Sequence, residues 1–362
     1  MTVDSISPSG STSPASSGSS TSDGTPIFLG IDVGGSFVKM GLVDGGGKIH
    51  AQTSVATKIL KTPEGVFEHA MKFARDRIEE GLGQPFSLSG VGLAVPGVLD
   101  TQTYRLREVV NLPGWVDRPL LEILVDKCRR PAAVVNDANA AAFAEHAKLG
   151  LGRRSLCLVT LGTGIGCGIV VNGYPHGGDH GCAGELGHMA IRFGQDAIPC
   201  SCGSCGHLES YAGAPGVLSR LRSAYALHTG SGGVPAWLNE DTTPRELADH
   251  ANDGDLVCLR VIDNTASYLG QAIGLLGQII DPAVVLLGGA MTFGGSGTEL
   301  GTRFLNKVKR HIQKTTLVQV GKHMIVDFAT MGNDAGIVGA ALVAQQNARR
   351  ESLSNTEAQL NP

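Results

Sequence analysis

The chain has 362 residues with a formal net charge of −4, and 42% of its residues are hydrophobic and 17% charged. This composition is typical of a globular protein, and the length predicts two domains. The slightly negative charge provides no general basic field, so neither nucleic acid nor a membrane is expected as a partner. Glycine accounts for 51 residues without a collagen repeat, which indicates many tight turns and close approaches of backbone to a ligand.

Both ends of the chain are expected to be disordered tails, at 1–25 and 349–362. The first tail is dominated by Ser, Thr, Gly and Pro, and it lacks the basic start and apolar run of a secretory signal. No later segment has the ~20 unbroken apolar residues of a membrane span. We expect an N-terminal α/β lobe at 26–150, joined by a C-terminal helix at 335–348, and a C-terminal α/β lobe at 151–334.

The N-terminal lobe opens with a short apolar strand at 27–32, a glycine turn and a second strand at 37–43. Further apolar runs predict strands at 91–96 and 132–135. A helix is expected at 138–149, since a glycine follows it and such a residue commonly ends a helix.

The strand, glycine turn and strand of the N-terminus recur in the C-terminal half. A buried strand is predicted at 156–160, a turn at 162–166 and a second strand at 167–171, with another strand at 284–287. An approximate repeat of this kind predicts two related domains.

The two glycine turns are candidate phosphate loops. Glycine lets backbone N–H groups point at an anion, a hydroxyl and a lysine add polar contacts, and an aspartate can hold Mg²⁺ directly or through water. The first loop comprises Asp32, Gly34, Gly35, Ser36 and Lys39, and the second comprises Thr160, Gly162, Thr163, Gly164 and Gly166. Either loop alone also fits a glycine hairpin turn, and the repetition favours phosphate. Neither is a P-loop or a dinucleotide fingerprint.

Asp137 lies at the junction between the strand predicted at 132–135 and the following helix. Ligands of α/β sheets gather at such strand ends, and the helix dipole favours an ionised carboxylate. Asp137 is therefore either a general base for a hydroxyl that attacks phosphorus, or only a helix cap. Asn136 and Asn139 offer amides for hydroxyl groups.

Three of the eight cysteines form a tight cluster with a histidine, which in a long chain indicates a metal site in a reducing compartment and a cytoplasmic protein. The cluster comprises Cys200, Cys202, Cys205 and His207. Thiolate and imidazole ligands favour a structural, tetrahedral zinc. Glu185, His188 and Glu209 flank this segment, and such carboxylates either accept hydrogen bonds from sugar hydroxyls or are surface charges.

Together these residues resemble the ROK family of sugar kinases and sugar-responsive repressors, over nearly the whole ordered chain. Both phosphate motifs and the segments 184–188 and 200–209 carry the resemblance. It implies an α/β, two-lobed actin-like ATPase (ribonuclease H-like) fold with a cleft between domains and a zinc-binding loop at 188–209. It also implies ATP and Mg²⁺ in the cleft, with the adenosine near Gly288 and Gly289, and a structural Zn²⁺.

The resemblance further implies roles for single residues. Asp137 would be the base for the 6-hydroxyl of the sugar, and His188 would both contact the sugar and bind zinc. The residues implied to hold the sugar are Asn111, Asn136, Asp137, Glu185, His188 and Glu209. A homodimer or homotetramer is implied in the same way.

The zinc segment departs from the family's usual Cys-x-Cys-Gly-x-x-Gly-Cys-x-Glu pattern. His207 replaces the third cysteine, and Cys205 appears two residues earlier. Because His207 keeps the register, the favoured ligand set is His188, Cys200, Cys202 and His207. The alternative set of Cys200, Cys202, Cys205 and His207 would free His188.

We therefore expect an ATP-dependent hexose kinase, with glucose as the favoured substrate. An N-acetylhexosamine, fructose or allose kinase of the same family is the alternative, and polyphosphate could replace ATP. A transcriptional regulator would need a helix-turn-helix before residue 27, where the apolar periodicity for one is missing. A zinc-dependent binding module without catalysis is disfavoured by Asp137 and both phosphate loops.

Overall fold

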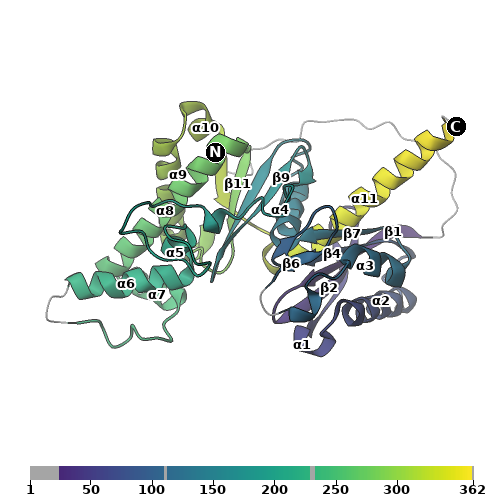
Figure 1. Cartoon of the computed structure of the whole chain (residues 1–362), viewed down its shortest axis with the longest axis horizontal. Coiled ribbons are helices and arrows are strands. Elements are labelled where there is room, and N and C mark those ends of the chain that lie inside the picture. The colour runs from purple at the N-terminus through teal and green to yellow at the C-terminus, as the bar shows by residue number, and fades with distance from the viewer. Residues whose placement is uncertain (1–23, 110–111, 229–232, 361–362) are drawn as a thin grey trace. The chain divides into compact units, whose positions relative to one another are not determined.

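The computed structural model describes residues 24–109, 112–228 and 233–360. Contacts divide the described chain into two compact units (Figure 1). Among the described residues, the first unit comprises 24–109, 112–153, 168–183 and 333–360, and the second comprises 154–167, 184–228 and 233–332.

The first unit contains a five-stranded sheet with the order β3-β2-β1-β4-β7. Its strands are β1 (Thr25–Val33), β2 (Phe37–Asp44), β3 (Ile49–Ala56), β4 (Phe86–Val95) and β7 (Ala132–Asn136). The first three form an antiparallel meander, whereas β1, β4 and β7 are parallel. The carboxyl ends of these three strands therefore lie at one edge of the sheet.

Two helices, α2 (Pro63–Glu80) and α3 (Leu120–Cys128), cover one face of this sheet (Figure 1). The start of α2 is set locally, because the Thr62 side chain accepts a hydrogen bond from Gly65 N and a proline occupies the first turn. Apolar side chains of the helices and strands form one core, which includes Leu29, Ile31, Val66, Phe67, Leu93 and Leu120.

The opposite face is covered by α4 (Asp137–Lys148) and α11 (Ala335–Leu360). Here the strands present glycine and alanine, since successive strand residues point to opposite faces. A Cβ on Gly30 or on Gly92 would overlap a main-chain carbonyl of α11, at Ala340 in the second case. The glycines thus allow α11 to pack directly against the sheet backbone.

A second five-stranded sheet has the order β10-β9-β8-β11-β12. Its strands are β8 (Leu156–Leu161), β9 (Ile165–Val171), β10 (Tyr174–Pro175), β11 (Val284–Gly288) and β12 (Ile325–Phe328). Strands β8, β11 and β12 are parallel, as are β1, β4 and β7 of the first sheet. The internal repeat predicted from the two glycine turns is confirmed by the matching strand orders.

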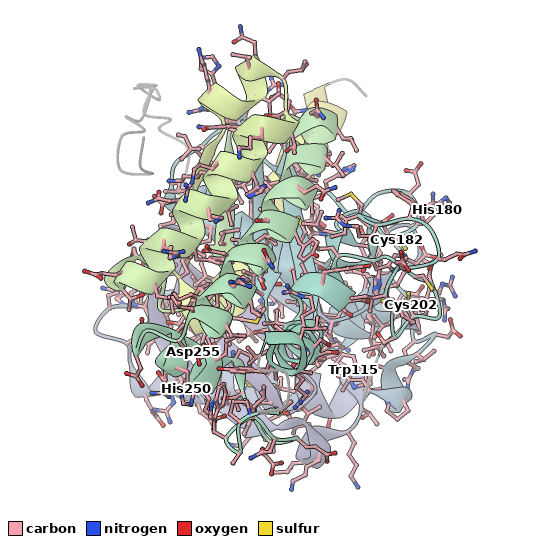
Figure 2. The ribbon with its side chains drawn as sticks, turned by 90° about the vertical axis from the view of Figure 1, so that its left-hand side faces the viewer. Trp115, His180, Cys182, Cys202, His250 and Asp255 are labelled. Carbon is pink, nitrogen blue, oxygen red and sulfur yellow. The ribbon has the colours of Figure 1, made fainter. Side chains whose placement is uncertain are left out.

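The second unit contains β8, β11 and β12 of this sheet and is completed by helices, of which the longest begins at a strong cap. Asp255 accepts hydrogen bonds from Val257 N and Cys258 N at 2.8 and 3.0 Å, and it lies close to His250 at the end of the preceding helix (Figure 2). These helices are α5 (Glu209–Ala212), α6 (Ala214–His228), α7 (Pro244–Asn252), α8 (Leu256–Ile280), α9 (Glu299–Thr315) and α10 (Val318–His323). The short elements of the first unit include α1 (Thr57–Leu60), β5 (Val98–Leu99), β6 (Leu106–Glu108) and a 3-10 helix at Pro113–Trp115.

The chain ends differ in part from the expectation. Only residues 24 and 25 of the expected N-terminal tail are among the described residues, and β1 begins at Thr25. A tail was expected at 349–362, but α11 continues to Leu360 because this segment holds several strong helix formers and no glycine or proline before Pro362. None of the described helices combines the length and apolar character needed to cross a membrane.

The unit boundary also differs from the expected lobes. Residues 168–183 were expected in the C-terminal lobe, whereas their contacts place them in the first unit. Gly168 explains this grouping, because its backbone lies against the carbonyl of Ala138 in α4 so closely that a Cβ would overlap it.

Candidate functional site

The first group of candidate residues lies at the carboxyl edge of the first sheet. Asp32 is the penultimate residue of β1, and Asn136 is the last residue of β7. Strand β4 lies between them, with Ala94 opposite Asp32 and Val95 opposite Asn136. Because the three strands are parallel, both polar residues end at the edge where ligands of α/β sheets bind.

Asp137 occupies the first turn of α4, and its neighbours fix the strand-to-helix junction. The Asn136 side chain caps the helix, accepting from Asn139 N at 3.1 Å and donating to Gly97 O at 3.2 Å. Asp137 is half-buried, and its Oδ1 accepts from Ala138 N at 2.8 Å. The helix N-terminus stabilises the ionised carboxylate at this position.

Asn139 does not present its amide oxygen to a ligand. It is buried, and its Oδ1 accepts a hydrogen bond from Ile169 N at 2.8 Å. Its interpretation as an amide for substrate hydroxyls is therefore wrong for that oxygen, because the side chain fastens β9 to α4.

The first glycine loop is held by a residue that the sequence did not reveal. Gly34 N donates to Phe37 O at 2.9 Å and closes the turn. Thr57, which is buried, donates from Oγ1 to Gly34 O at 2.7 Å and from its backbone N to Ser36 O at 2.9 Å. Gly35 and Ser36 remain exposed, so the loop is fixed by its carbonyls while its tip stays accessible.

Asp32 is largely buried beside the loop, between Lys39 and the start of α11. Burial raises the pKa of the Asp32 carboxyl, and the positive charge of Lys39 offsets this only in part. A Cβ on Gly336 would overlap the carboxylate, so α11 begins directly against it, and Lys39 Nζ donates to Asn333 O at 3.3 Å. A carboxylate with incompletely compensated charge fits an oxygen-seeking cation such as Mg²⁺.

The second loop connects β8 to β9 and is closed by its own backbone. Gly162 N donates to Gly164 O at 3.0 Å, and Ala214 N donates to Gly162 O at 3.0 Å. Gly162 has no positive φ, and a Cβ there would meet nothing within 4 Å. The fold itself therefore does not require glycine at position 162, although a ligand approaching the backbone would.

Glu209 is directly bonded to this loop. Its Oε2 accepts a hydrogen bond from Ile165 N at 2.9 Å, and a Cβ on Gly164 would lie 2.5 Å from the same oxygen. Glu209 begins α5, two residues after His207. The sequence left a sugar contact or a surface charge open for Glu209 and did not predict this bond, because no local pattern signals a hydrogen bond between residues 44 positions apart.

Gly288 ends β11, Gly289 follows it, and both lie beside the second loop. Gly288 pairs with Thr160 across the parallel strands. Gly289 has φ +89° and its backbone lies against Leu161, where a side chain would overlap the carbonyl oxygen. Both glycine turns of the second unit thus lie at the carboxyl ends of neighbouring parallel strands.

The favoured metal set is brought together in the second unit. The ligand atoms of His188, Cys200, Cys202 and His207 all lie within 4.8 Å of one another. Cys200 Sγ is 3.8 Å from His188 Nδ1, and Cys202 Sγ is 3.3 Å from His207 Nδ1. Cys205 is exposed and is not part of this described cluster. Cys202 is also exposed, at the edge of the molecule in Figure 2, but it belongs to the cluster. Two thiols and two imidazoles in this proximity fit tetrahedral zinc.

The electrostatics of the cluster also suit a metal. Burial acts to raise the pKa of the Cys200 thiol, but hydrogen bonds from Cys202, His207 and His188 outweigh it and lower this pKa to about 6. The thiolate is the form that binds metal. Glu185 Oε2 lies 4.0 Å from His188 Nε2, the ring nitrogen that does not face Cys200. This distance is too long for a hydrogen bond, so in this structure the carboxylate faces the second nitrogen without binding it.

The remaining sequence candidates are distributed as follows. Asn111 lies outside the described residues. The first unit contains Asp32, Gly34, Gly35, Ser36, Lys39, Asn136 and Asp137. The second unit contains Thr160, Gly162, Thr163, Gly164, Gly166, Glu185, His188, Cys200, Cys202, Cys205, His207, Glu209, Gly288 and Gly289.

Paired sheets with glycine loops at the strand ends define the class of actin-like ATPases, and the comparisons agree with this fold. A sequence model of the ROK family matches residues 28–347, and the chain belongs to this family. A ROK hexokinase from Thermus thermophilus has a TM-score of 0.71 at 30% identity, with 90% of this chain and 99% of that chain covered. A ROK family glucokinase from Streptomyces griseus, solved with glucose and AMPPNP, has a TM-score of 0.66 at 28% identity, with 88% and 99% covered.

Sequence relatives differ in the sugar that their names specify. A glucokinase of Halalkalibacterium halodurans is 32% identical over 340 residues, which cover 91% of this chain and 98% of that protein. An N-acetylmannosamine kinase of Citrobacter koseri is 28% identical, with 88% and 98% covered. A putative xylose repressor of Caldicellulosiruptor is 29% identical, with 86% of this chain and 76% of that protein covered.

Proposed function

We propose that the protein transfers the terminal phosphoryl group of ATP to the 6-hydroxyl of a hexose, with glucose as the favoured substrate. The observation that carries this proposal is Asp137, held in the first turn of α4 at the carboxyl end of β7. The similar glucokinases and hexokinases support the reaction class, and the glucokinase with bound glucose and AMPPNP supports the pair of substrates.

Asp137 is the general base in this proposal. The ionised carboxylate accepts the proton of the 6-hydroxyl as that oxygen attacks the terminal phosphorus. Asn136 fixes the junction through its hydrogen bonds to Asn139 N and Gly97 O, so Asp137 is positioned before substrate arrives. Asn136, Glu185, His188 and Glu209, together with Asn111, are proposed to hold the sugar.

The two glycine loops are proposed to bind the phosphates of ATP through backbone N–H groups. Thr57 fixes the first loop and Glu209 the second, so neither loop needs to reorganise when the nucleotide binds. Asp32 would hold Mg²⁺, which neutralises charge on the phosphate oxygens. The cluster of His188, Cys200, Cys202 and His207 would hold Zn²⁺, which fixes the conformation of the loop that carries them.

The test is an assay of ADP release with Mg-ATP across glucose, fructose, allose and the N-acetylhexosamines. Turnover with glucose above all others is expected. Preference for an N-acetylated sugar would leave Asp137 as the proposed base and would replace glucose as the proposed substrate. Absence of turnover with every sugar, from protein that binds one, would overturn the ATP-dependent kinase, and a parallel assay with polyphosphate would show whether the donor alone was wrong.

The base is tested by Asp137→Asn, which keeps the shape of the side chain but removes its ability to accept the proton. Turnover should fall by at least ~10²-fold while sugar affinity stays near normal. Asp126→Asn, on the exposed surface of α3, is the matched control and should leave both unchanged. Wild-type turnover in Asp137→Asn would remove the base assignment.

A further inference from the structure

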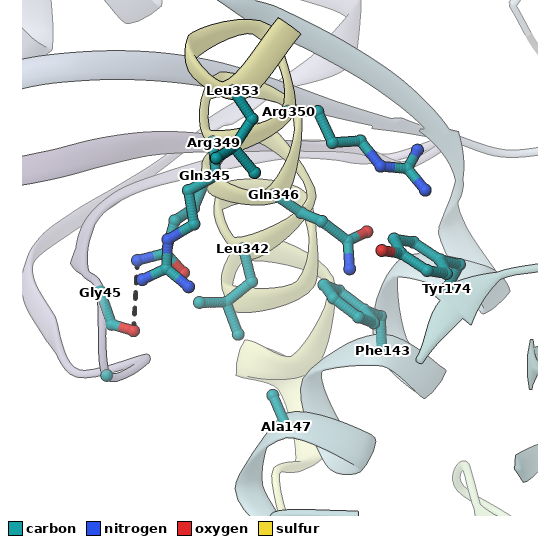
Figure 3. Close-up of a pocket in the computed structure, with 11 residues that line it drawn as sticks. Gly45, Phe143, Ala147, Tyr174, Leu342, Gln345, Gln346, Arg349, Arg350 and Leu353 are labelled. Atoms are coloured by element: carbon teal, nitrogen blue, oxygen red, sulfur yellow. Dashed lines mark hydrogen bonds between the residues drawn. The ribbon is translucent and has the colours of Figure 1, made fainter. Parts of the chain in front are cut away.

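A pocket in the first unit has no part in the proposed reaction. It has a volume of about 440 Å³ and is formed by α11, α4, the turn after β2 and strand β10 (Figure 3). This size lies within the usual ~300–1,000 Å³ of small-molecule sites. The pocket is therefore large enough for a small metabolite.

The pocket has an apolar floor between two polar sides. Leu342 of α11 lies between the Gly45 turn and Phe143 of α4, and Phe143 lies below Tyr174 (Figure 3). One side carries Arg349 near the Gly45 turn, and the other carries Arg350 above Tyr174. An apolar floor accepts a flat ring, and the polar sides accept charged or hydrogen-bonding groups at its edges.

The charge of the pocket favours an anion. Its lining contains two arginines and no acidic residue, and neither guanidinium forms an ion pair with any described carboxylate. The Arg350 guanidinium lies 4.0 Å from the centre of the Tyr174 ring, a cation–π contact that restricts its orientation. Arginine is the side chain best matched to phosphate, because its planar fork donates two parallel hydrogen bonds.

Nearby groups do not neutralise these arginines. Asp44, next to Gly45, pairs with His50 Nε2 at 2.8 Å and accepts two backbone hydrogen bonds of the turn, and in the described part of the chain neither it nor Glu351 forms an ion pair with Arg349 or Arg350. The two glutamines of the lining donate to main-chain carbonyls, at Gly45 (3.4 Å) and Gly173 (3.0 Å), and add no charge. The two arginines thus remain available to a ligand.

We propose that this pocket binds a small phosphate-bearing molecule with a flat ring. The ring lies on Leu342 and Phe143, the phosphate pairs with Arg350, and Arg349 adds positive charge from the other side of the pocket. Asp137 begins the helix that supplies Phe143, and α11 packs so closely on α4 that a Cβ on Gly339 would overlap the Ala140 carbonyl. A ligand in the pocket would therefore contact both helices of this closely packed pair, and its binding does not rest on the proposed function.

The probe for this site is 1-naphthyl phosphate, titrated by calorimetry into the full chain saturated with glucose and AMP-PNP. One molecule per chain should bind, and affinity should fall with added salt because the contact is ionic. Inorganic phosphate should compete weakly, and 1-naphthol should bind at least tenfold more weakly than the phosphate ester. Equal binding of 1-naphthol, or no binding of the ester, would overturn the proposal.

Variants locate the binding. Arg350→Ala and Arg349→Ala should each weaken 1-naphthyl phosphate at least fivefold and together at least tenfold. Ala147→Trp should block the pocket without changing its charge, since Ala147 lines it from the exposed end of α4. Arg75→Ala, on the exposed face of α2, is the control and should bind normally.

Unchanged affinity in the folded arginine variants and in Ala147→Trp would place the binding elsewhere and overturn the proposal. Loss of affinity in these variants from a chain that phosphorylates no sugar would refute the proposed function and leave the site standing. The two failures are therefore distinguishable.

Discussion

Gly162→Ala separates what the fold requires from what a ligand requires. A Cβ at this position meets nothing within 4 Å, and the backbone has no positive φ. Alanine should therefore be tolerated, and it should raise the free energy of unfolding by about 0.4–1 kcal/mol because it restricts the unfolded chain. The hydrogen bonds from Gly162 N to Gly164 O and from Ala214 N to Gly162 O are unaffected by the methyl group.

The affinity for nucleotide should fall, although the protein becomes more stable. A phosphate that accepts hydrogen bonds from this loop must approach its backbone closely, and the new methyl group occupies that space. Losing one charge-assisted hydrogen bond costs about 1.5–3 kcal/mol, which corresponds to roughly 10- to 100-fold weaker binding. The measurements are thermal unfolding and the calorimetric affinity for Mg-AMP-PNP.

Two further glycine substitutions serve as controls. Gly297→Ala also adds a Cβ where nothing lies within 4 Å, so it should leave nucleotide affinity unchanged. Gly164→Ala places the Cβ 2.5 Å from Glu209 Oε2 and should destabilise the protein. If Gly162→Ala bound Mg-AMP-PNP as tightly as the unmodified chain, this loop would not be a phosphate site.

Three further results are expected. Glu209→Ala should weaken nucleotide binding about tenfold because Ile165 N loses its acceptor. Glu209→Gln keeps an oxygen there, so its nucleotide affinity should stay within about threefold of that of the unmodified chain. Equal effects of the two substitutions would contradict a loop-positioning role. Cys200→Ser should abolish stoichiometric zinc, measured by plasma mass spectrometry, and should lower the unfolding temperature. Cys205→Ser should keep the metal. Loss of zinc from both variants would favour the alternative ligand set of Cys200, Cys202, Cys205 and His207. Gly92→Ala should cost at least about 1–3 kcal/mol in urea unfolding, since its Cβ would overlap the backbone of α11, and a neutral result would contradict that packing.

Local patterns in the sequence were sufficient for many of the elements that carry the site. The helix expected at 138–149 is α4 (Asp137–Lys148), and the strand expected at 284–287 is β11 (Val284–Gly288). These elements are signalled by caps, glycines and apolar runs within a few residues. The proximity of the favoured metal set was also anticipated, because three of its four members lie within eight residues.

Contacts between distant segments could not be read from the sequence. Thr57 fixes a loop 23 residues away, and Glu209 binds a loop 44 residues away. Neither bond leaves a local signature, because each side chain alone is equally consistent with a helix start or with solvent exposure. The grouping of residues 168–183 with the first unit depends in the same way on a close glycine contact with α4.

The packing of α11 against Gly30 and Gly92 has a consequence for synthesis of the protein. The strands of the first sheet leave the ribosome early, but the helix that covers one of their faces is encoded at 335–360, after nearly the whole second unit. At roughly 5–20 residues per second, this face waits on the order of tens of seconds for its cover. The nascent first unit therefore has all five strands of its sheet but leaves part of one sheet face uncovered during most of translation.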